Sequence, residues 1–174
     1  MHRNRKSPSG PSEHEYSLVG FRVGSGLFAV DVSSVREILA PGVLVTVPQA
    51  SKIVLGVIEH RGKVVPIVDL RRRFGFGPLP STQRAKWIVV DIGGVWFGLV
   101  ADEVTEVFQV GASQERVSPR VGSGDVAQGF SKVFAYDKQI VMVMDLPALA
   151  RAIDRDEVLP SGSINPPALE GVTP

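Results

Sequence analysis

Short apolar runs, rich in Val, Ile and Phe and separated by glycine-containing turns, recur along most of the chain. Runs of this length and composition are typical of β-strands, and many of them at short intervals indicate a small barrel or a sandwich. We therefore predict strands over Tyr16–Val23, Leu27–Val32, Leu44–Val47, Leu55–Ile58, Lys63–Val68, Lys86–Ile92, Val95–Ala101, Phe130–Ala135 and Gln139–Met144.

Two of the turns have the composition of tight hairpins. Gly24-Ser25-Gly26 and Gly93-Gly94 place residues that tolerate positive φ between apolar strands, so the flanking strands should be antiparallel. Helical signal is sparse. The segment Ser34-Val35-Arg36-Glu37 fits a capping box, in which Ser34 accepts from a backbone N–H and Glu37 reaches back to the cap. We predict one short helical turn there.

The two halves of the chain contain an internal repeat. Three residues of one strand-and-turn segment recur 69 positions later: Phe28, Val35 and Glu37 match Phe97, Val104 and Glu106. Farther on, a strand pair from Gly56 to Asp69 recurs between Gly129 and Asp145, as the displacement rises from 73 to 76. Units this small are insecure alone and should pack together about a pseudo-twofold axis. The predicted fold is all-β, with two small five-stranded barrels and short helical turns.

The two ends of the chain are rich in Pro, Ser and Gly and carry little apolar patterning. Such segments cannot bury enough apolar surface to offset the entropy of ordering. We predict a disordered basic arm over residues 1–14, a double-barrel domain over residues 15–153, and a mostly flexible, Pro-rich tail over residues 154–174.

Charge and composition narrow the class of partner. The formal net charge is +1, so protein partners are favoured and nucleic acid is not expected. The chain has no cysteine, which excludes disulfides and thiolate metal sites and suits a reducing cytosol. The longest apolar stretches, such as Val64–Val68 and Ile140–Met144, fall far short of the ~20 residues that a membrane helix needs. We expect a soluble, cytoplasmic protein without direct membrane insertion.

The sequence presents no evident constellation for catalysis or cofactor binding. His2 and His14 fall in the predicted arm, so a histidine metal cluster is not expected. His60 lies beside Glu59 and near Asp69, but no activated nucleophile accompanies them. We predict no metal, no cofactor and no enzymatic activity.

Other polar motifs have structural interpretations. Asp69 and Asp145 each end an apolar strand in the same repeat context, where an aspartate can cap the following turn through its side-chain oxygens. The run Arg71-Arg72-Arg73 follows a strand directly, and we interpret it as a solvated helical turn or loop rather than a phosphate site. The Gly-rich segments lack the Lys-Ser/Thr ending of a phosphate loop.

One continuous run carries a specific family resemblance. Residues 56–71, Gly-Val-Ile-Glu-His-Arg-Gly-Lys-Val-Val-Pro-Ile-Val-Asp-Leu-Arg, resemble the central segment of chemotaxis coupling (CheW-like) proteins, in which Gly-Val-Ile-Asn-x-Arg-Gly precedes Pro, two apolar residues and Asp-Leu. Upstream, Phe28–Val32 and Val35–Ile38 match the first hairpin and turn of that family. The resemblance covers about residues 15–153. It departs from the pattern at Glu59, where Asn is usual, which leaves the receptor preference open.

The resemblance implies a fold of two five-stranded, SH3-like barrels and an adaptor that catalyses no reaction. Such an adaptor binds the cytoplasmic tip of a methyl-accepting chemoreceptor with one surface and the regulatory domain of a CheA-type histidine kinase with another, which would bring it to receptor arrays. At matching positions, the implied receptor groove consists of Val35, Glu37, Ile38, Gly56, Arg61 and Gly62.

These residues have both binding and structural interpretations. For binding, Gly56 would let a receptor helix approach, Arg61 would donate to a receptor carboxylate or carbonyl, and Glu37 would pair with a basic or amide group. For structure alone, Glu37 would close its capping box, Gly56 would mark tight strand packing, and Gly62 would serve a hairpin turn. The apolar pair, Val35 and Ile38, would line the groove or belong to the core.

Three other functions stay open on sequence alone. The same adaptor could serve a kinase that controls surface motility or gene expression. A small-barrel nucleic-acid binder would use Arg71–Arg73 and the basic arm, with Phe74 and Phe76 as candidates for stacking on bases. A hydrolase would use His60 and would lose its turnover when His60 is replaced by Ala.

Overall fold

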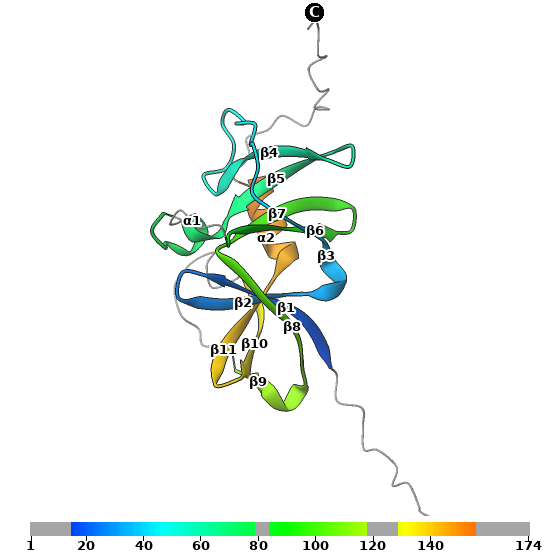
Figure 1. The fold of residues 1–174 in the computed structure, drawn as a ribbon, viewed down its shortest axis with the longest axis vertical. Helices are drawn as coiled ribbons and strands as arrows, with labels where there is room; N and C mark the ends of the chain where they lie inside the picture. Colours follow the sequence, from blue (N-terminus) through cyan, green and yellow to red (C-terminus); the bar gives the residue numbers. More distant parts are fainter. Residues whose placement is uncertain (1–14, 79–83, 118–128, 156–174) are drawn as a thin grey trace, which may run out of the picture.

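The computed structural model describes residues 15–78, 84–117 and 129–155 (Figure 1). Most of them form strands, joined by short turns and two short 3-10 helices. The elements in chain order are β1 (Tyr16–Val23), β2 (Gly26–Asp31), η1 (Val32–Ser34), β3 (Val35–Leu39), β4 (Val54–His60), β5 (Lys63–Asp69), α1 (Leu70–Phe74), β6 (Lys86–Ile92), β7 (Val95–Ala101), β8 (Glu103–Val110), η2 (Ala112–Gln114), β9 (Glu115–Arg116), β10 (Phe130–Tyr136), β11 (Gln139–Met144) and α2 (Leu146–Arg155).

The strands form two sheets that correspond position by position. The five-stranded sheet has the order β3-β6-β7-β5-β4, and the six-stranded sheet has the order β8-β1-β2-β11-β10-β9. Each contains one parallel pair, β5 with β7 and β2 with β11. The two sheets occupy the upper and lower halves of Figure 1. This correspondence confirms the predicted all-β fold of two small barrels related by a pseudo-twofold.

The two barrels are not the two sequence repeats. β3 leaves the first repeat to pair with β6, and β8 leaves the second repeat to pair with β1. The parallel pairs also join strands from different repeats. Each barrel therefore contains strands from both halves of the chain, so neither repeat completes a barrel alone.

The helical turn predicted at Ser34–Glu37 is wrong, because residues 35–39 form the strand β3. The 3-10 helix η1 precedes it, and the carboxylate of Asp31 caps η1 by accepting from the Ser33 N–H at 2.8 Å. Antiparallel pairing with β6 satisfies the backbone of β3. Tertiary pairing has outweighed the local capping signal.

Other predictions divide between confirmed and wrong. Both hairpins are confirmed, because Val23 pairs with Gly26 and Ile92 pairs with Val95. The strand predicted over Leu44–Val47 is wrong, since only a single bridge from Val45 to Val57 forms there. The strand β8 and the ten-residue helix α2 were not predicted.

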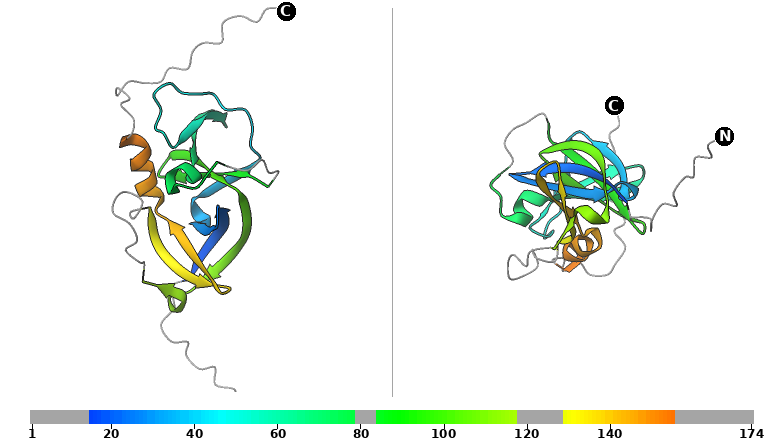
Figure 2. Two further views of the ribbon diagram at one scale, coloured as in Figure 1. Left: turned by 90° about the vertical axis from the view of Figure 1, so that its left-hand side faces the viewer. Right: turned by 90° about the horizontal axis from the view of Figure 1, so that it is seen from below.

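The core has three parts. The largest lies between the sheets and takes side chains from both, together with Leu146, Leu149 and Ile153 of α2. These three residues recur at a spacing of three to four and so share one helix face. Figure 2 shows α2 along one side of the molecule, beside the upper half and directly after β11 of the lower half. Two smaller clusters fill the barrel interiors, one around Phe108 and Phe134 and the other around Trp87 and Ile67.

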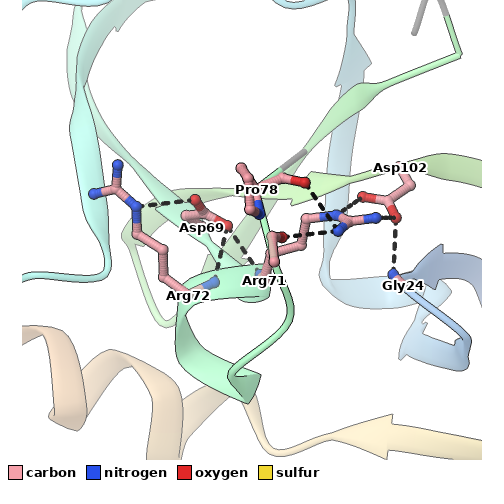
Figure 3. A network of polar contacts seen from close by, with 7 residues as sticks. Gly24, Asp69, Arg71, Arg72, Pro78 and Asp102 are labelled. Carbon is pink, nitrogen blue, oxygen red and sulfur yellow. Dashed lines mark hydrogen bonds and ion pairs between the residues drawn. The ribbon is translucent and has the colours of Figure 1, made fainter. Parts of the chain in front are cut away.

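A polar network also ties the two barrels together (Figure 3). Arg71 of α1 donates two hydrogen bonds to Asp102, from Nε at 2.8 Å and from Nη2 at 2.7 Å. Asp102, between β7 and β8, also accepts from the Gly24 N–H of the β1–β2 turn at 2.8 Å. The guanidinium of Arg71 further donates to the Gly77 carbonyl at 2.8 Å. Elements of both sheets are thereby held in one relative position.

The structure tests two predictions about the polar residues that follow β5 and β11. The predicted capping role is confirmed: Asp69 accepts from the Arg71 N–H at 2.9 Å, and Asp145 accepts from the Ala148 N–H at 2.8 Å. The predicted helical turn at Arg71–Arg73 is also confirmed. Its solvated character is wrong for Arg71, whose side chain is only 13% exposed and is paired with Asp102.

Candidate partner-binding surface

All six residues of the expected receptor groove belong to the five-stranded barrel. Val35, Glu37 and Ile38 lie on β3, Gly56 lies on β4, and Arg61-Gly62 form the β4–β5 turn. β3 and β4 stand at opposite ends of the strand order. The sheet has nevertheless curled until these two edges face each other, because side chains from both of them meet.

The meeting point is a three-residue cluster of Glu37, His60 and Arg61, which we call the clasp. Glu37 Oε2 accepts from Arg61 Nε at 3.1 Å and from Arg61 Nη2 at 2.9 Å. His60 Nε2 lies 2.9 Å from the same oxygen. One carboxylate therefore joins the two edges of the barrel.

The three side chains of the clasp differ in their exposure to solvent. The side chain of His60 is 17% exposed, that of Glu37 is 33% exposed and that of Arg61 is 68% exposed. The hydrogen bonds from Arg61, and secondly from His60, hold the pKa of Glu37 below its usual value. Because Arg61 uses only one edge of its guanidinium on Glu37, its outer edge is directed away from the carboxylate.

β3 presents apolar side chains on the face away from the barrel interior. A register shift between Val35 and Glu37 places Val35 opposite Val90 and Ile38 opposite Ile88, so Val35 and Ile38 share a face. Val35 packs against the central core. Ile38 is 42% exposed. The edge strand thus offers an apolar contact on the face opposite to that of Glu37.

The two glycines of the expected groove occupy different surroundings. A Cβ on Gly56 would lie 2.6 Å from the backbone oxygen of Val45, so the chain itself makes the close approach there. Gly62 has a φ of 75° within the β4–β5 turn, and nothing lies near the position of its Cβ. These are the surroundings that the structural interpretations of tight packing and turn formation require.

A second apolar surface was missed by sequence reasoning. On the outer face of β4 and β5, Val57 lies opposite both Val45 and Pro66, and Val64 lies in the next row opposite Glu59. We call the four apolar residues, Val45, Val57, Val64 and Pro66, the valine patch. Val45 is 64% exposed and Val64 is also exposed. No strand forms between β3 and β4, so no strand pattern in the sequence marks this surface.

The described residues do not support the catalytic or nucleic-acid readings. His60 contacts Glu37 rather than Asp69, which caps α1. Phe74 stacks on Phe28 at 5.1 Å between centroids, and Phe76 packs against the central core. Within residues 15–78, 84–117 and 129–155 there is no group of three or more His, Asp or Glu placed to hold a metal.

No described helix is long and apolar enough to cross a bilayer.

Comparisons with known proteins agree on one family. A family model described as the CheW-like domain matches residues 17–154. The chain is 32% identical over 139 residues to the probable chemotaxis protein CheW of Rhizobium etli, covering 79% of this chain and 89% of that protein. It is 31% identical over 124 residues to Protein PilI of Pseudomonas aeruginosa, covering 67% of this chain and 70% of that protein.

A solved structure gives the same fold. The crystal structure of the scaffolding protein TtCheW from Thermoanaerobacter tengcongensis matches with a TM-score of 0.69 at 24% identity, covering 84% of this chain and 91% of that chain. The match to the CheW-like family model spans both barrels and includes every residue of the clasp. The chain therefore belongs to the family of proteins with a CheW-like domain.

Proposed function

We propose that the protein is a non-enzymatic chemotaxis adaptor that binds the cytoplasmic tip of a chemoreceptor and the regulatory domain of a CheA-type histidine kinase. The observation that carries this proposal is the family match over residues 17–154. The similarity to a CheW protein and to a scaffolding protein supports it. Its place of action is the cytoplasm, at receptor arrays through its partners.

The receptor contact involves β3 and the clasp. An amphipathic receptor helix would place an apolar side chain against Ile38, which is exposed beside the half-buried Val35. The outer edge of Arg61 would donate to a carboxylate of that helix, since a guanidinium forms strong charge-assisted pairs. Glu37 is already satisfied by two bases, so it orients Arg61 rather than contacting the receptor directly.

The kinase contact involves the valine patch. Val45 and Val64 are exposed on the outer face of β4 and β5, with Val57 and Pro66 between them. A barrel of the kinase regulatory domain would cover such a surface, because burial of apolar area drives association. The receptor contact lies where β3 meets the β4–β5 turn, whereas the kinase contact lies on the outer face of β4 and β5. The two partners would therefore use different surfaces and bind at once.

Signal transfer then needs no chemistry. Simultaneous binding raises the local concentration of kinase at the receptor. The receptor conformation would bias kinase activity as a coupling free energy between the two surfaces. The rigid connection through Arg71 and Asp102 supports such a transfer, because it fixes the barrels relative to each other.

A second pathway is favoured by one comparison. The similarity to Protein PilI, whose name does not mention chemotaxis, supports the same adaptor role with a kinase that controls surface motility or gene expression. Genes beside the one for this chain separate the two pathways, because a chemotaxis cluster would encode receptors and flagellar switch proteins.

The test is calorimetry of the full chain against two separate probes, a receptor-tip fragment and the kinase regulatory domain encoded nearest to it. Arg61→Glu should weaken receptor binding at least tenfold and leave kinase binding unchanged. Val45→Asp should do the reverse. Lys138→Glu in the β10–β11 turn and Val107→Asp on β8 are matched controls on the other barrel. Failure of the folded wild-type chain to bind either probe would contradict the proposal.

A further inference from the structure

The clasp contains a titratable ring. His60 is the one histidine among the described residues, and its Nε2 lies 2.9 Å from Glu37 Oε2. Imidazole is the side chain whose ordinary titration falls near neutral pH. The charge of the clasp therefore depends on whether this ring carries one proton or two.

The charged groups around His60 come from several elements. Glu37 of β3 and Arg61 of the turn contact each other and belong to the clasp. Lys63, at the start of β5, lies over the Trp96 ring at 5.0 Å, and the His60 ring lies 6.4 Å from the same ring. Glu59, the preceding residue on β4, is exposed.

A further carboxylate, Asp91, lies on β6, the strand that pairs with β3. Asp91 accepts a hydrogen bond from Trp96 and forms an ion pair with Arg36 at 2.6 Å. Glu37 is thus the acidic group in direct contact with His60, and the other acids have partners or face solvent.

Protonation of His60 changes the clasp in two ways. A neutral ring must carry its proton on Nε2 to donate to Glu37, and the added proton then goes to Nδ1. The hydrogen bond to Glu37 becomes charge-assisted and therefore stronger. The formal charge of the clasp rises from zero to +1, since Glu37 balances only Arg61 when the ring is neutral.

We propose that His60 is a positioning residue that makes the receptor contact pH-dependent: its protonated ring holds Glu37 in place, so that Arg61 faces the partner from a net positive clasp. This inference rests on the proposed function. An acidic receptor group would bind more tightly as pH falls from 8 to 6. The expected gain is about threefold, the size of one unit charge acting through several ångströms of water.

The first arm of the test needs no partner. In the full chain, NMR would follow the His60 ring and the Arg61 Nε–H signal from pH 8 to 6, with ring signals assigned by their loss in His60→Gln. The Arg61 signal should move with the midpoint of the His60 titration and should stay still in His60→Gln. Gln can still donate one hydrogen bond to Glu37 but does not titrate. An Arg61 signal that ignores the titration of His60 would overturn the positioning role.

The second arm measures affinity for the receptor-tip fragment at pH 6 and pH 8. The wild-type chain should show the threefold change, His60→Gln should lose it, and the control Glu59→Gln should retain it. Equal pH dependence in wild type and His60→Gln would overturn the inference while leaving the adaptor role standing. If the fragment binds at neither pH, the proposed function fails, and the pH-dependent contact fails with it whatever the first arm reports.

Discussion

The two barrels contain equivalent hairpin turns that have similar backbone conformations but different side chains. In the β4–β5 turn, Arg61 and Gly62 have φ values of 52° and 75°, and in the β10–β11 turn, Asp137 and Lys138 have φ values of 42° and 60°. The repeat displacement of 76 makes these pairs equivalent. The fold has kept the backbone of the turn, although three of the four residues are not glycine.

The side chains at these equivalent places have diverged. Glu106 corresponds to Glu37, but Asp137 stands where the first barrel has Arg61, and Tyr136 stands where it has His60. Tyr136 stacks on Phe108 at 4.2 Å between centroids. An ion pair therefore joins β3 to the β4–β5 turn in one barrel, and an aromatic pair joins β8 to β10 in the other. The two barrels therefore share one topology but differ in the charged and aromatic side chains near the two equivalent turns.

The largest expected effect compares the equivalent core residues Phe28 and Phe97. Both are buried, but Phe28 also stacks on Phe21, Phe74 and Phe130. Phe28→Ala should lower the free energy of unfolding by about 4–5 kcal/mol and Phe97→Ala by about 3–4 kcal/mol, because ring pairs add to the cost of the cavity. Urea denaturation measures both. A larger loss for Phe97→Ala would contradict the comparison.

The next effect concerns the connection between the barrels. Asp102→Ala should lower the free energy of unfolding by about 2–4 kcal/mol, because it leaves the largely buried Arg71 without its counterion. Asp91→Ala is the matched control. Its partner Arg36 is about half exposed, so the loss should be smaller than that of Asp102→Ala. Equal losses of unfolding free energy in the two variants would show that the Arg71–Asp102 ion pair stabilises the fold no more than an exposed pair does.

Exchanging the charged residues of the two turns tests whether only the β4–β5 turn binds the receptor. Arg61→Asp places two carboxylates together and should weaken receptor binding at least tenfold. The loss in unfolding free energy should stay smaller than that of Asp102→Ala, because the Arg61 side chain is 68% exposed. Asp137→Arg should add about 0.5 kcal/mol or less by pairing with Glu106, which lines the same small cavity. Receptor binding restored by Asp137→Arg in the Arg61→Asp background would contradict the assignment of the contact to one barrel.

The smallest effect is in acid. The pKa of Glu37 is lowered by Arg61 first and by His60 second. Its contribution to stability is therefore fully present above the ordinary value of 4.5 and is lost as pH falls below 4.5 through the lowered folded pKa. The slope of stability against pH in this range should be shallower in Glu37→Gln than in wild type. An unchanged slope would show that the clasp does not stabilise the fold.

Sequence reasoning located most strands because apolar runs and glycine turns are local signals. It failed where a local signal competes with pairing to a distant strand: Ser34–Glu37 resembles a helix cap, yet residues 35–39 pair with β6. It also overlooked β8, whose sequence Glu-Val-Thr-Glu-Val-Phe-Gln-Val mixes charged and apolar residues. The exchange of β3 and β8 between the repeats has no local signature.

The candidate site was predicted in part. The positions of Glu37 and Arg61 followed from the family resemblance. Arg61 was expected to face a partner, and Glu37 was expected either to face a partner or to close a capping box. The structure pairs them with each other, 24 residues apart in the chain. His60 was considered only for catalysis. Its role beside Glu37 depends on the curling of the sheet, which brings two edges together and which sequence spacing does not reveal.

The central claim is that receptor and kinase bind this chain at the same time. Sedimentation velocity of an equimolar mixture of the full chain, the receptor-tip fragment and the kinase regulatory domain tests it most directly. We expect one species that contains all three components, and loss of only the receptor fragment from that species with Arg61→Glu. Separate two-component complexes, in which each partner displaces the other, would contradict it.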